Sequence, residues 1–184
     1  SVDDLVYQGG SMGELLLNGV YLPLDNDRHQ FDAHFFHNQA EIAMLSALYQ
    51  PSKKHRVNGT MTLSQLPLKM LNPFLGETGR MQGWLNGRMT LAGTNKKPSW
   101  NGHLQLDSAS AYVTAAGTEF RFDDRKVDVK NSKIRFNKYS IHTNGNNPFV
   151  INGTVDISRP MHETVNLRLT ANNMQLLDTR KEPG

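Results

Sequence analysis

Ser11 is the residue best placed by its neighbours to act as a nucleophile, because it stands in the run Gly9-Gly10-Ser11-Met12-Gly13. This run fits the G-x-S-x-G pattern of hydrolases, in which the Ser sits on a sharp turn between a strand and a helix. The residues after Gly13 have the pattern of a strand, so the required helix is not expected. We therefore interpret the run as a linker or hairpin loop and predict no enzyme and no catalytic residue.

Four side chains of a short segment, those of His29, Asp32, His34 and His37, are of types that bind metal ions. On a strand, His29 and His37 would lie on one face and the other two on the opposite face. Ligands must converge, so we predict no metal site and interpret the segment as a surface strand with His at polar positions. No Gly-rich phosphate-binding motif occurs, and no cofactor is predicted.

The composition excludes several further classes of protein. The chain has no Cys, which rules out disulfides and thiolate chemistry. The 20 basic and 17 acidic residues are interspersed, apart from the clusters Lys53-Lys54-His55-Arg56 and Lys96-Lys97, so no nucleic acid is predicted as a partner. The sequence starts without Met and contains no apolar run long enough to span a bilayer. We expect a single β-rich module, 1–184, that is a fragment of a longer protein.

Alternation of apolar and polar residues is the strongest structural signal and is typical of strands with one buried face. Between these segments lie turn-rich breaks, including Thr94 to Lys97 and Asp123 to Lys126. The alternating pairs and triplets are Leu104/Leu106, Ala111/Val113, Phe120/Phe122, Val127/Val129, Ile134/Phe136, Tyr139/Ile141, Phe149/Ile151, Val155/Ile157 and Val165/Leu167/Leu169. The pattern predicts an all-β fold, a long antiparallel meander.

The segment 1–60 is less regular, although Phe31/Ala33/Phe35 repeats the alternation. Leu68, Leu71 and Leu75 follow Pro67 at helical spacing and predict one short helix, which Pro73 would interrupt or end. For Glu41 to Leu48, helix and strand both remain open.

Six Asn-Gly dipeptides begin at Asn18, Asn58, Asn86, Asn101, Asn144 and Asn152. Asn-Gly usually marks a two-residue hairpin turn, across which the apolar residues must change parity. Parity is kept across five of them, so their glycines, which include Gly59, Gly87, Gly102 and Gly153, are predicted to lie inside strands and on the apolar side. Glycines aligned on one side of many strands indicate a strongly curved sheet. Asn144-Gly145 is interpreted as an ordinary turn.

An apolar face of this length must be covered by a second sheet, by the same sheet folding over, or by an apolar ligand. Two interpretations therefore stay open. One is a structural or adhesive β-sandwich or solenoid module of a cell-surface protein, with a closed core. The other is a curved sheet whose apolar groove takes a ligand.

The segment 61–177 resembles the TamB family. The resemblance rests on Leu85 to Gly93 and on Pro98-Ser99-Trp100-Asn101-Gly102-His103-Leu104, which are similar to the family's strand-Gly-strand-Pro-x-hydrophobic-x-Gly unit. It continues through Phe120 to Asp124, Lys133 to Phe136 and Phe149 to Val155. The order and spacing are similar to the C-terminal region of that family, and related AsmA-like envelope proteins share the style. Residues 1–60 carry little of the resemblance.

The resemblance implies a taco-like or trough-like sheet with an apolar interior, in a periplasmic protein anchored in the inner membrane by a segment outside this sequence. It further implies outer-membrane biogenesis, by phospholipid transport between the inner and outer membranes, by protein translocation and assembly, or by both. The expected partners are phospholipid acyl chains or unfolded β-strands, and an outer-membrane barrel of the TamA or BamA type. Lipid and protein cargo both remain open.

The predicted lining of the apolar groove consists of equivalent positions on successive strands. These are Met89, Leu91, Leu104, Leu106, Phe120, Phe122, Val127, Val129, Ile134, Phe136, Phe149, Ile151, Val155, Ile157, Val165, Leu167 and Leu169.

Overall fold

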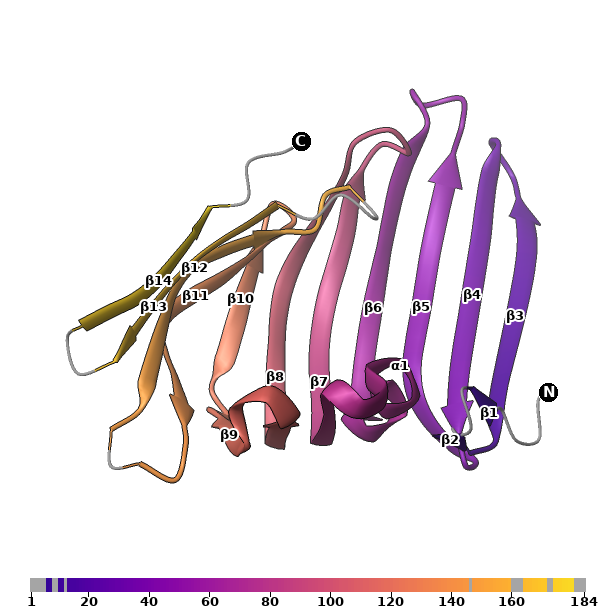
Figure 1. The fold of residues 1–184 in the computed structure, drawn as a ribbon. Helices are drawn as coiled ribbons and strands as arrows, with labels where there is room; N and C mark the ends of the chain where they lie inside the picture. The colour runs from indigo at the N-terminus through magenta and orange to yellow at the C-terminus, as the bar shows by residue number, and fades with distance from the viewer. Residues whose placement is uncertain are drawn as a thin grey trace.

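A computed structural model of the chain describes residues 6–7, 10–11, 13–145, 147–159, 164–171 and 174–180. It is built almost entirely from strands (Figure 1). The strands are β1 (Val6–Tyr7), β2 (Gly10–Ser11), β3 (Leu15–Leu24), β4 (Arg28–His37), β5 (Ala40–Gln50), β6 (Arg56–Pro67), β7 (Gly79–Gly93), β8 (Pro98–Val113), β9 (Thr118–Phe122), β10 (Lys126–Lys130), β11 (Lys133–His142), β12 (Phe149–Asp156), β13 (Thr164–Ala171) and β14 (Met174–Arg180).

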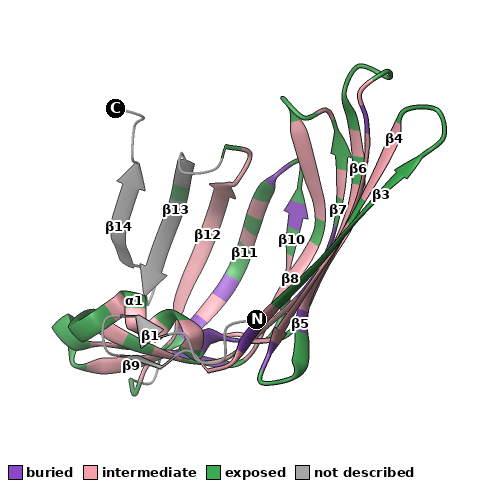
Figure 2. Cartoon of the chain, turned by 90° about the vertical axis from the view of Figure 1, so that its right-hand side faces the viewer, coloured by how far each residue is buried: buried purple, intermediate pink, exposed green. Residues whose placement is uncertain are grey.

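All strands from β3 to β14 form one antiparallel sheet in which strands pair with their neighbours along the chain, except that β9 and β10 do not pair with each other. Of the strands that the structure describes, β1 and β2 stand apart as a short two-stranded sheet. Figure 2 shows the large sheet turning strongly between β8 and β12. The structure confirms the predicted all-β meander and its strong curvature. It also settles 41–48, left open by the sequence, as part of strand β5.

The chain between β8 and β11 differs from the prediction. The predicted break at Asp123 to Lys126 falls between β9 and β10. However, these two strands do not pair with each other, because both pair with β8 on one side and with β11 on the other. They are therefore two halves of one interrupted strand. The interruption is held by Asp123, whose carboxylate accepts hydrogen bonds from the backbone N–H and from Nε of Arg125, at 2.9 and 2.8 Å.

The helical segment follows β6 and comprises a 3₁₀ turn η1 (Leu68–Leu71), the helix α1 (Asn72–Leu75) and a second 3₁₀ turn η2 (Gly76–Thr78). Pro73 was expected to interrupt or end a helix, but it lies in the first turn of α1. Backbone N–H groups of the first turn make no hydrogen bond within the helix, so the missing N–H of Pro73 does not disrupt it. The side chain of Asn72 bonds to both backbone groups of Met81 in β7, its Oδ1 lying 2.7 Å from the Met81 nitrogen. Asn72 thus replaces β6 as a partner of β7 beyond the point where β6 ends.

One edge of the sheet is β3, which is apolar on both faces. Leu17 and Tyr21 are 66% and 53% exposed, and Val20 and Leu22, which alternate with them, are 59% and 52% exposed. Among the described strands, β3 pairs only with β4. In the described part of the chain, this edge thus combines backbone groups that have no strand partner on the outer side with exposed apolar side chains.

Candidate functional site

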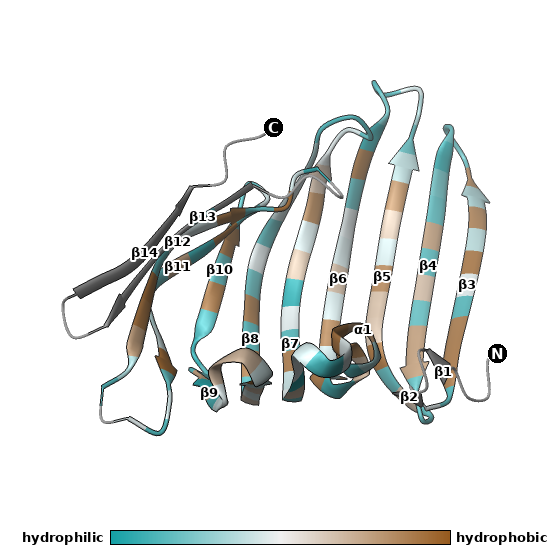
Figure 3. Cartoon of the chain, viewed as in Figure 1, coloured by the Kyte–Doolittle hydropathy of each residue, from teal (hydrophilic) through white to brown (hydrophobic). Residues whose placement is uncertain are grey.

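The register of the sheet brings apolar residues from successive strands together on one face. Residues directly opposite each other in paired strands share a face. Leu91 lies opposite both Gly59 and Trp100, and Val129 lies opposite Ile134. Figure 3 shows the resulting bands of apolar and polar residues along β3 to β8. We call the face that carries Leu91 and its cross-strand partners the apolar face.

Most of the predicted lining residues lie on the apolar face and are half-buried. Met89 and Val129 are buried, at 6% and 3% exposure. The half-buried residues are Leu91, Leu104, Leu106, Phe120, Phe122, Val127, Ile134, Phe136, Phe149, Ile151, Val155 and Ile157. Ile157 lies just beyond the end of β12. Of Val165, Leu167 and Leu169 the structure describes only the backbone, which pairs opposite Val155, Gly153 and Ile151.

The glycines predicted inside strands are found there, each opposite a larger apolar residue. Gly59 pairs with Leu91, Gly87 with Leu104 and Gly102 with Met89. A Cβ on Gly59 would lie 2.5 Å from the carbonyl oxygen of Ser46, and one on Gly102 would lie 2.1 Å from that of Arg88. These two glycines therefore permit an approach of neighbouring backbones that no side chain would allow. Gly153 likewise pairs with Phe136, and Asn144-Gly145 lies in the connection between β11 and β12, as predicted.

Three β-bulges keep the apolar residues on one face although their parity changes along the sequence. Each contains a residue with positive φ, namely Gln65 at 53°, Ser108 at 49° and Lys138 at 49°. On β11, for example, the register shifts between Phe136 and Tyr139, so both stay on the apolar face. A bulge adds one residue to a strand and thereby reverses the alternation beyond it. Sequence reasoning treated the segments on either side as separate pairs and missed the bulges.

Asn side chains of the Asn-Gly dipeptides stabilise two of these bulges. The Oδ1 atom of Asn86 accepts a hydrogen bond from the backbone N–H of Gln65, and that of Asn152 accepts one from the backbone N–H of Lys138, both at 2.8 Å. Each bulge leaves a backbone donor without a strand partner, and the amide oxygen satisfies it. In these two dipeptides, therefore, Asn caps a bulge from the face opposite to that of Gly87 or Gly153.

We expect Asn152→Ala to lower the free energy of unfolding by about 1 kcal/mol, because the Lys138 N–H loses its acceptor. The matched control is Asn58→Ala, since β5 and β6 pair at Asn58 without a register shift. Urea denaturation followed by circular dichroism measures both variants. Equal midpoints for the two would contradict the capping role of Asn152.

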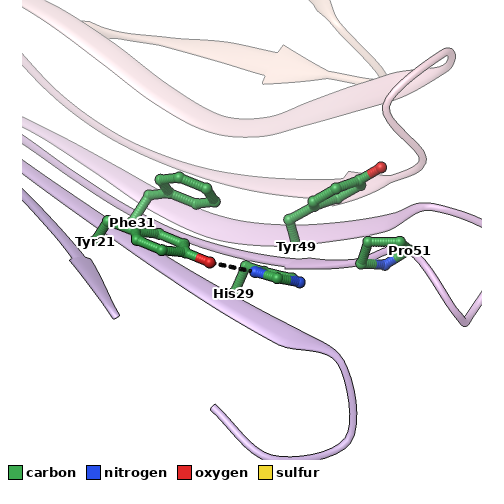
Figure 4. A pocket seen from close by; sticks show the side chains of 5 residues that line it. All are labelled: Tyr21, His29, Phe31, Tyr49 and Pro51. Atoms are coloured by element: carbon green, nitrogen blue, oxygen red, sulfur yellow. Dashed lines mark hydrogen bonds between the residues drawn. The ribbon is translucent and has the colours of Figure 1, made fainter. Parts of the chain in front are cut away.

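A shallow depression of about 390 Å³ lies at the β3 side of the apolar face. It is lined by Tyr21, His29, Phe31, Tyr49 and Pro51 (Figure 4). The rings of Tyr21 and Phe31 lie 5.0 Å apart, and the Tyr21 hydroxyl lies 2.7 Å from Nδ1 of His29. The predicted lining contained none of these residues, although the alternation of Phe31 with Ala33 and Phe35 was a signal that pointed to them.

The four candidate metal ligands are divided between the faces, as the parity argument predicted. His29 shares the face of Phe31, while Asp32 and His34 alternate with them on the other. However, the prediction that His29 lies on the polar face is wrong, because His29 lies on the apolar face and lines the depression. Its Nε2 atom lies 3.0 Å from Oδ1 of Asp27. The hydrogen bond from His29 holds the pKa of Asp27 below its usual value. In the described part of the chain, no three His, Cys, Asp or Glu side chains are grouped to hold a metal ion.

Tyr139 is the most perturbed ionisable group of the apolar face. It is 4% exposed, and its hydroxyl donates a hydrogen bond to the backbone carbonyl of Asp123, beside the interruption between β9 and β10. Burial, and secondarily the negative charge of Asp123, raise the pKa of Tyr139 to about 12. The phenol is thus neutral at physiological pH and contributes a ring to the apolar face without a charge.

The comparisons with known proteins give one family match. Residues 18–106 match the TamB N-terminal domain. The match supports the assignment of the chain to the TamB family. It likewise supports a location in the cell envelope and a general role in envelope biogenesis. It does not confirm the predicted likeness to the C-terminal region, because the domain found is the N-terminal one. No curated protein and no solved structure matched the chain.

The TamB match covers most of β3, the strands β4 to β7 and the first half of β8, together with the helical segment. It therefore includes the aromatic depression and the lining residues Met89, Leu91, Leu104 and Leu106, and it begins in the part of the sequence where the resemblance was weak. Within the described residues, no helix has the length and apolar character needed to cross a bilayer.

Proposed function

We propose that this TamB-like chain is a non-enzymatic module of the bacterial envelope whose apolar face binds phospholipid acyl chains during transport between the inner and outer membranes. In this proposal the apolar face lines the hollow of the curved sheet. The opposite face, which carries Arg88, His103, Asp128 and Arg135, stays in water. Acyl chains gain by leaving water for such a surface, at about 0.8 kcal/mol per buried methylene group.

The observation that carries the proposal is the partial exposure of the apolar face. Of the 14 predicted lining residues whose side chains are described, 12 are half-buried rather than buried. A closed sandwich core would bury them completely. The accessible surface of the chain is 12286 Å², whereas a compact monomer of 20.7 kDa would expose about 8,900 Å². Both observations favour an open sheet over a closed structural or adhesive module.

The decisive experiment is native mass spectrometry of the chain purified from bacterial envelopes without detergent. We expect adducts with the masses of phospholipids. The absence of lipid would favour the closed structural module and contradict the proposal.

The wider assignment rests on the TamB resemblance. We place the chain in the periplasm, in a protein anchored in the inner membrane by another segment, with an outer-membrane barrel of the TamA or BamA type as partner. No catalytic step and no cofactor form part of the proposal.

A second candidate function, assembly of outer-membrane proteins, is favoured by the edge strand β3. Its outer edge offers backbone groups to an added strand, and its exposed Leu17, Val20, Tyr21 and Leu22 offer contacts on both faces. An extended peptide that joins a sheet edge gains main-chain hydrogen bonds along its length. Unfolded β-strands are the corresponding cargo.

We expect Val20→Lys with Leu22→Lys to weaken binding of a fluorescent ten-residue peptide of alternating Val and Thr by about tenfold, because charged side chains protect sheet edges from pairing. Fluorescence anisotropy measures the affinity. The matched control is Gln82→Lys with Thr90→Lys, two exposed positions on the interior strand β7. If both double variants bind the peptide like the unchanged chain, strand addition at β3 is wrong.

A further inference from the structure

The hairpin turns at one end of the sheet gather eight of the 16 exposed Lys and Arg residues in the described part of the chain. This end, at the top of Figure 1, holds the turns after β3, β5, β7 and β10, together with residues 157–159 that follow β12. Its exposed basic residues are Lys53, Lys54, Arg56, Lys96, Lys97, Lys130, Lys133 and Arg159, with Arg28 half-exposed beside them. Its acidic residues within the described ranges are Asp25, Asp27 and Asp156. We call this end the basic rim.

Backbone hydrogen bonds join these turns into a continuous rim. The turn after β5 meets the turn after β7, because the N–H of Asn95 donates to the carbonyl of His55 at 3.0 Å. The turn after β10 meets the start of β8, because the N–H of Ser132 donates to the carbonyl of Trp100 at 2.9 Å. The chain after β12 joins the same turn, because the N–H of Ile157 donates to the carbonyl of Ser132 at 2.8 Å. The clusters 53–56 and 96–97, separate in sequence, thus become neighbours. From β5 to β12 the sheet has seven strand positions, with β9 and β10 counted as one, and this part of the rim is roughly 30 Å long.

The charges of the rim are largely uncompensated. None of its Lys or Arg side chains takes part in a salt bridge among the described residues. Of its acidic residues, Asp27 is engaged by His29 and by the N–H of Ser52, and Asp156 is bonded to Ser158 and lies near Lys133 and Arg159. Among the described residues, the turns at the opposite end carry a small negative excess instead, with Glu14, Glu41, Glu77 and Glu119 against Lys69, Arg80 and Arg121, whose guanidinium bonds to the turn after β11. The sheet is therefore electrically polar from end to end.

We infer that the basic rim docks onto the surface of an anionic bilayer, with its side chains among lipid phosphates. Six of the eight exposed cations are Lys, a flexible point charge suited to a diffuse layer of headgroups, whereas specific phosphate recognition favours the planar fork of Arg. At the same end, β3 exposes Leu22 and Leu24, at 52% and 37%. Exposed apolar side chains beside a row of cations are typical of surfaces that lie on membranes. The predominance of Lys and the exposed leucines favour a membrane over a nucleic acid as the partner of the rim.

This inference goes beyond the proposed function, because docking by the rim does not require acyl chains to bind the apolar face. The two can nevertheless act together, since the rim is the end at which a lipid held on the apolar face would meet the membrane.

The test uses sedimentation of the chain with vesicles of phosphatidylcholine containing phosphatidylglycerol. We expect the unchanged chain to bind these vesicles, to bind pure phosphatidylcholine vesicles poorly, and to be released by salt. The variant Lys53→Glu, Lys54→Glu, Lys96→Glu, Lys97→Glu should bind at least about tenfold more weakly. Its matched control is Lys69→Glu, Arg80→Glu, Lys126→Glu, Lys138→Glu, which has the same net charge and changes exposed residues away from the rim.

The outcomes separate the alternatives. Normal binding by the rim variant, or an equal loss in both variants, would overturn the inference, since the second result would reflect net charge alone. Binding to a duplex oligonucleotide without binding to anionic vesicles would also overturn it. Native mass spectrometry of both chains keeps the two proposals distinct. Phospholipid still bound to a rim variant that no longer docks supports both proposals, whereas rim-dependent docking by an unchanged chain that carries no phospholipid supports the rim alone.

Discussion

Replacing Ile151 by Asp is expected to reduce the amount of phospholipid that co-purifies with the chain to less than about a tenth. The reason is that a carboxylate on an apolar surface must keep its water, and this water displaces acyl-chain contacts. Ile151 lies opposite Tyr139 on the apolar face, near the middle of the β11–β12 pair. Phe136→Asp on the neighbouring strand should have the same effect. The measurement is native mass spectrometry, with far-ultraviolet circular dichroism expected to stay β-like.

The neighbouring residue provides the control for this variant. Val150 lies on the same strand and is half-buried like Ile151. Its side chain points to the other face of the sheet, where Ser140 is its cross-strand partner. Val150→Asp adds the same charge at nearly the same point and should leave the amount of bound lipid unchanged. Unchanged lipid in Ile151→Asp, or an equal loss in both variants, would argue against a lipid-binding role of the apolar face.

The largest effect on stability is expected for Gly102→Ala, which should lower the free energy of unfolding by about 3 kcal/mol or more. The new Cβ would stand 2.1 Å from the carbonyl oxygen of Arg88 and 2.8 Å from Cα of Met89, which are backbone atoms of the paired strand β7. In addition, the φ of Gly102 is +151°, which L side chains rarely adopt. Urea denaturation followed by circular dichroism measures the loss.

Gly19→Ala is the control for Gly102→Ala, because Gly19 also follows an Asn inside a strand. A Cβ there would approach no atom closer than the carbonyl oxygen of Asp32, at 4.0 Å. We expect its effect to stay within about 1 kcal/mol in either direction. If the two variants unfold at the same urea concentration, close backbone approach does not explain the glycine inside β8.

The interior glycines show how much of the fold and the candidate site the sequence could predict. Constant parity across Gly59, Gly87 and Gly153 identified them as strand residues, and the structure places each of them inside a strand. The same alternation predicted which residues lie together on the apolar face. Such inferences succeed because the direction of a side chain on a strand depends only on its own backbone.

The β3 edge and the aromatic depression were not predictable in this way. Tyr21, His29 and Tyr49 meet only because β3, β4 and β5 pair in one particular register. Before the partner of a strand is known, an alternating segment such as 29–35 cannot be assigned to the middle or the edge of a sheet.

By itself, the sequence determined the all-β class, the interior position of the glycines and the amphipathic character of the sheet, because these follow from local alternation. Only the tertiary structure decided the bulges at Gln65, Ser108 and Lys138, the merging of β9 and β10 into one interrupted strand, and the assembly of Lys53–Lys54 with Lys96–Lys97 into a rim. These features depend on contacts between segments distant in the chain, whose energies appear only when the strands pair.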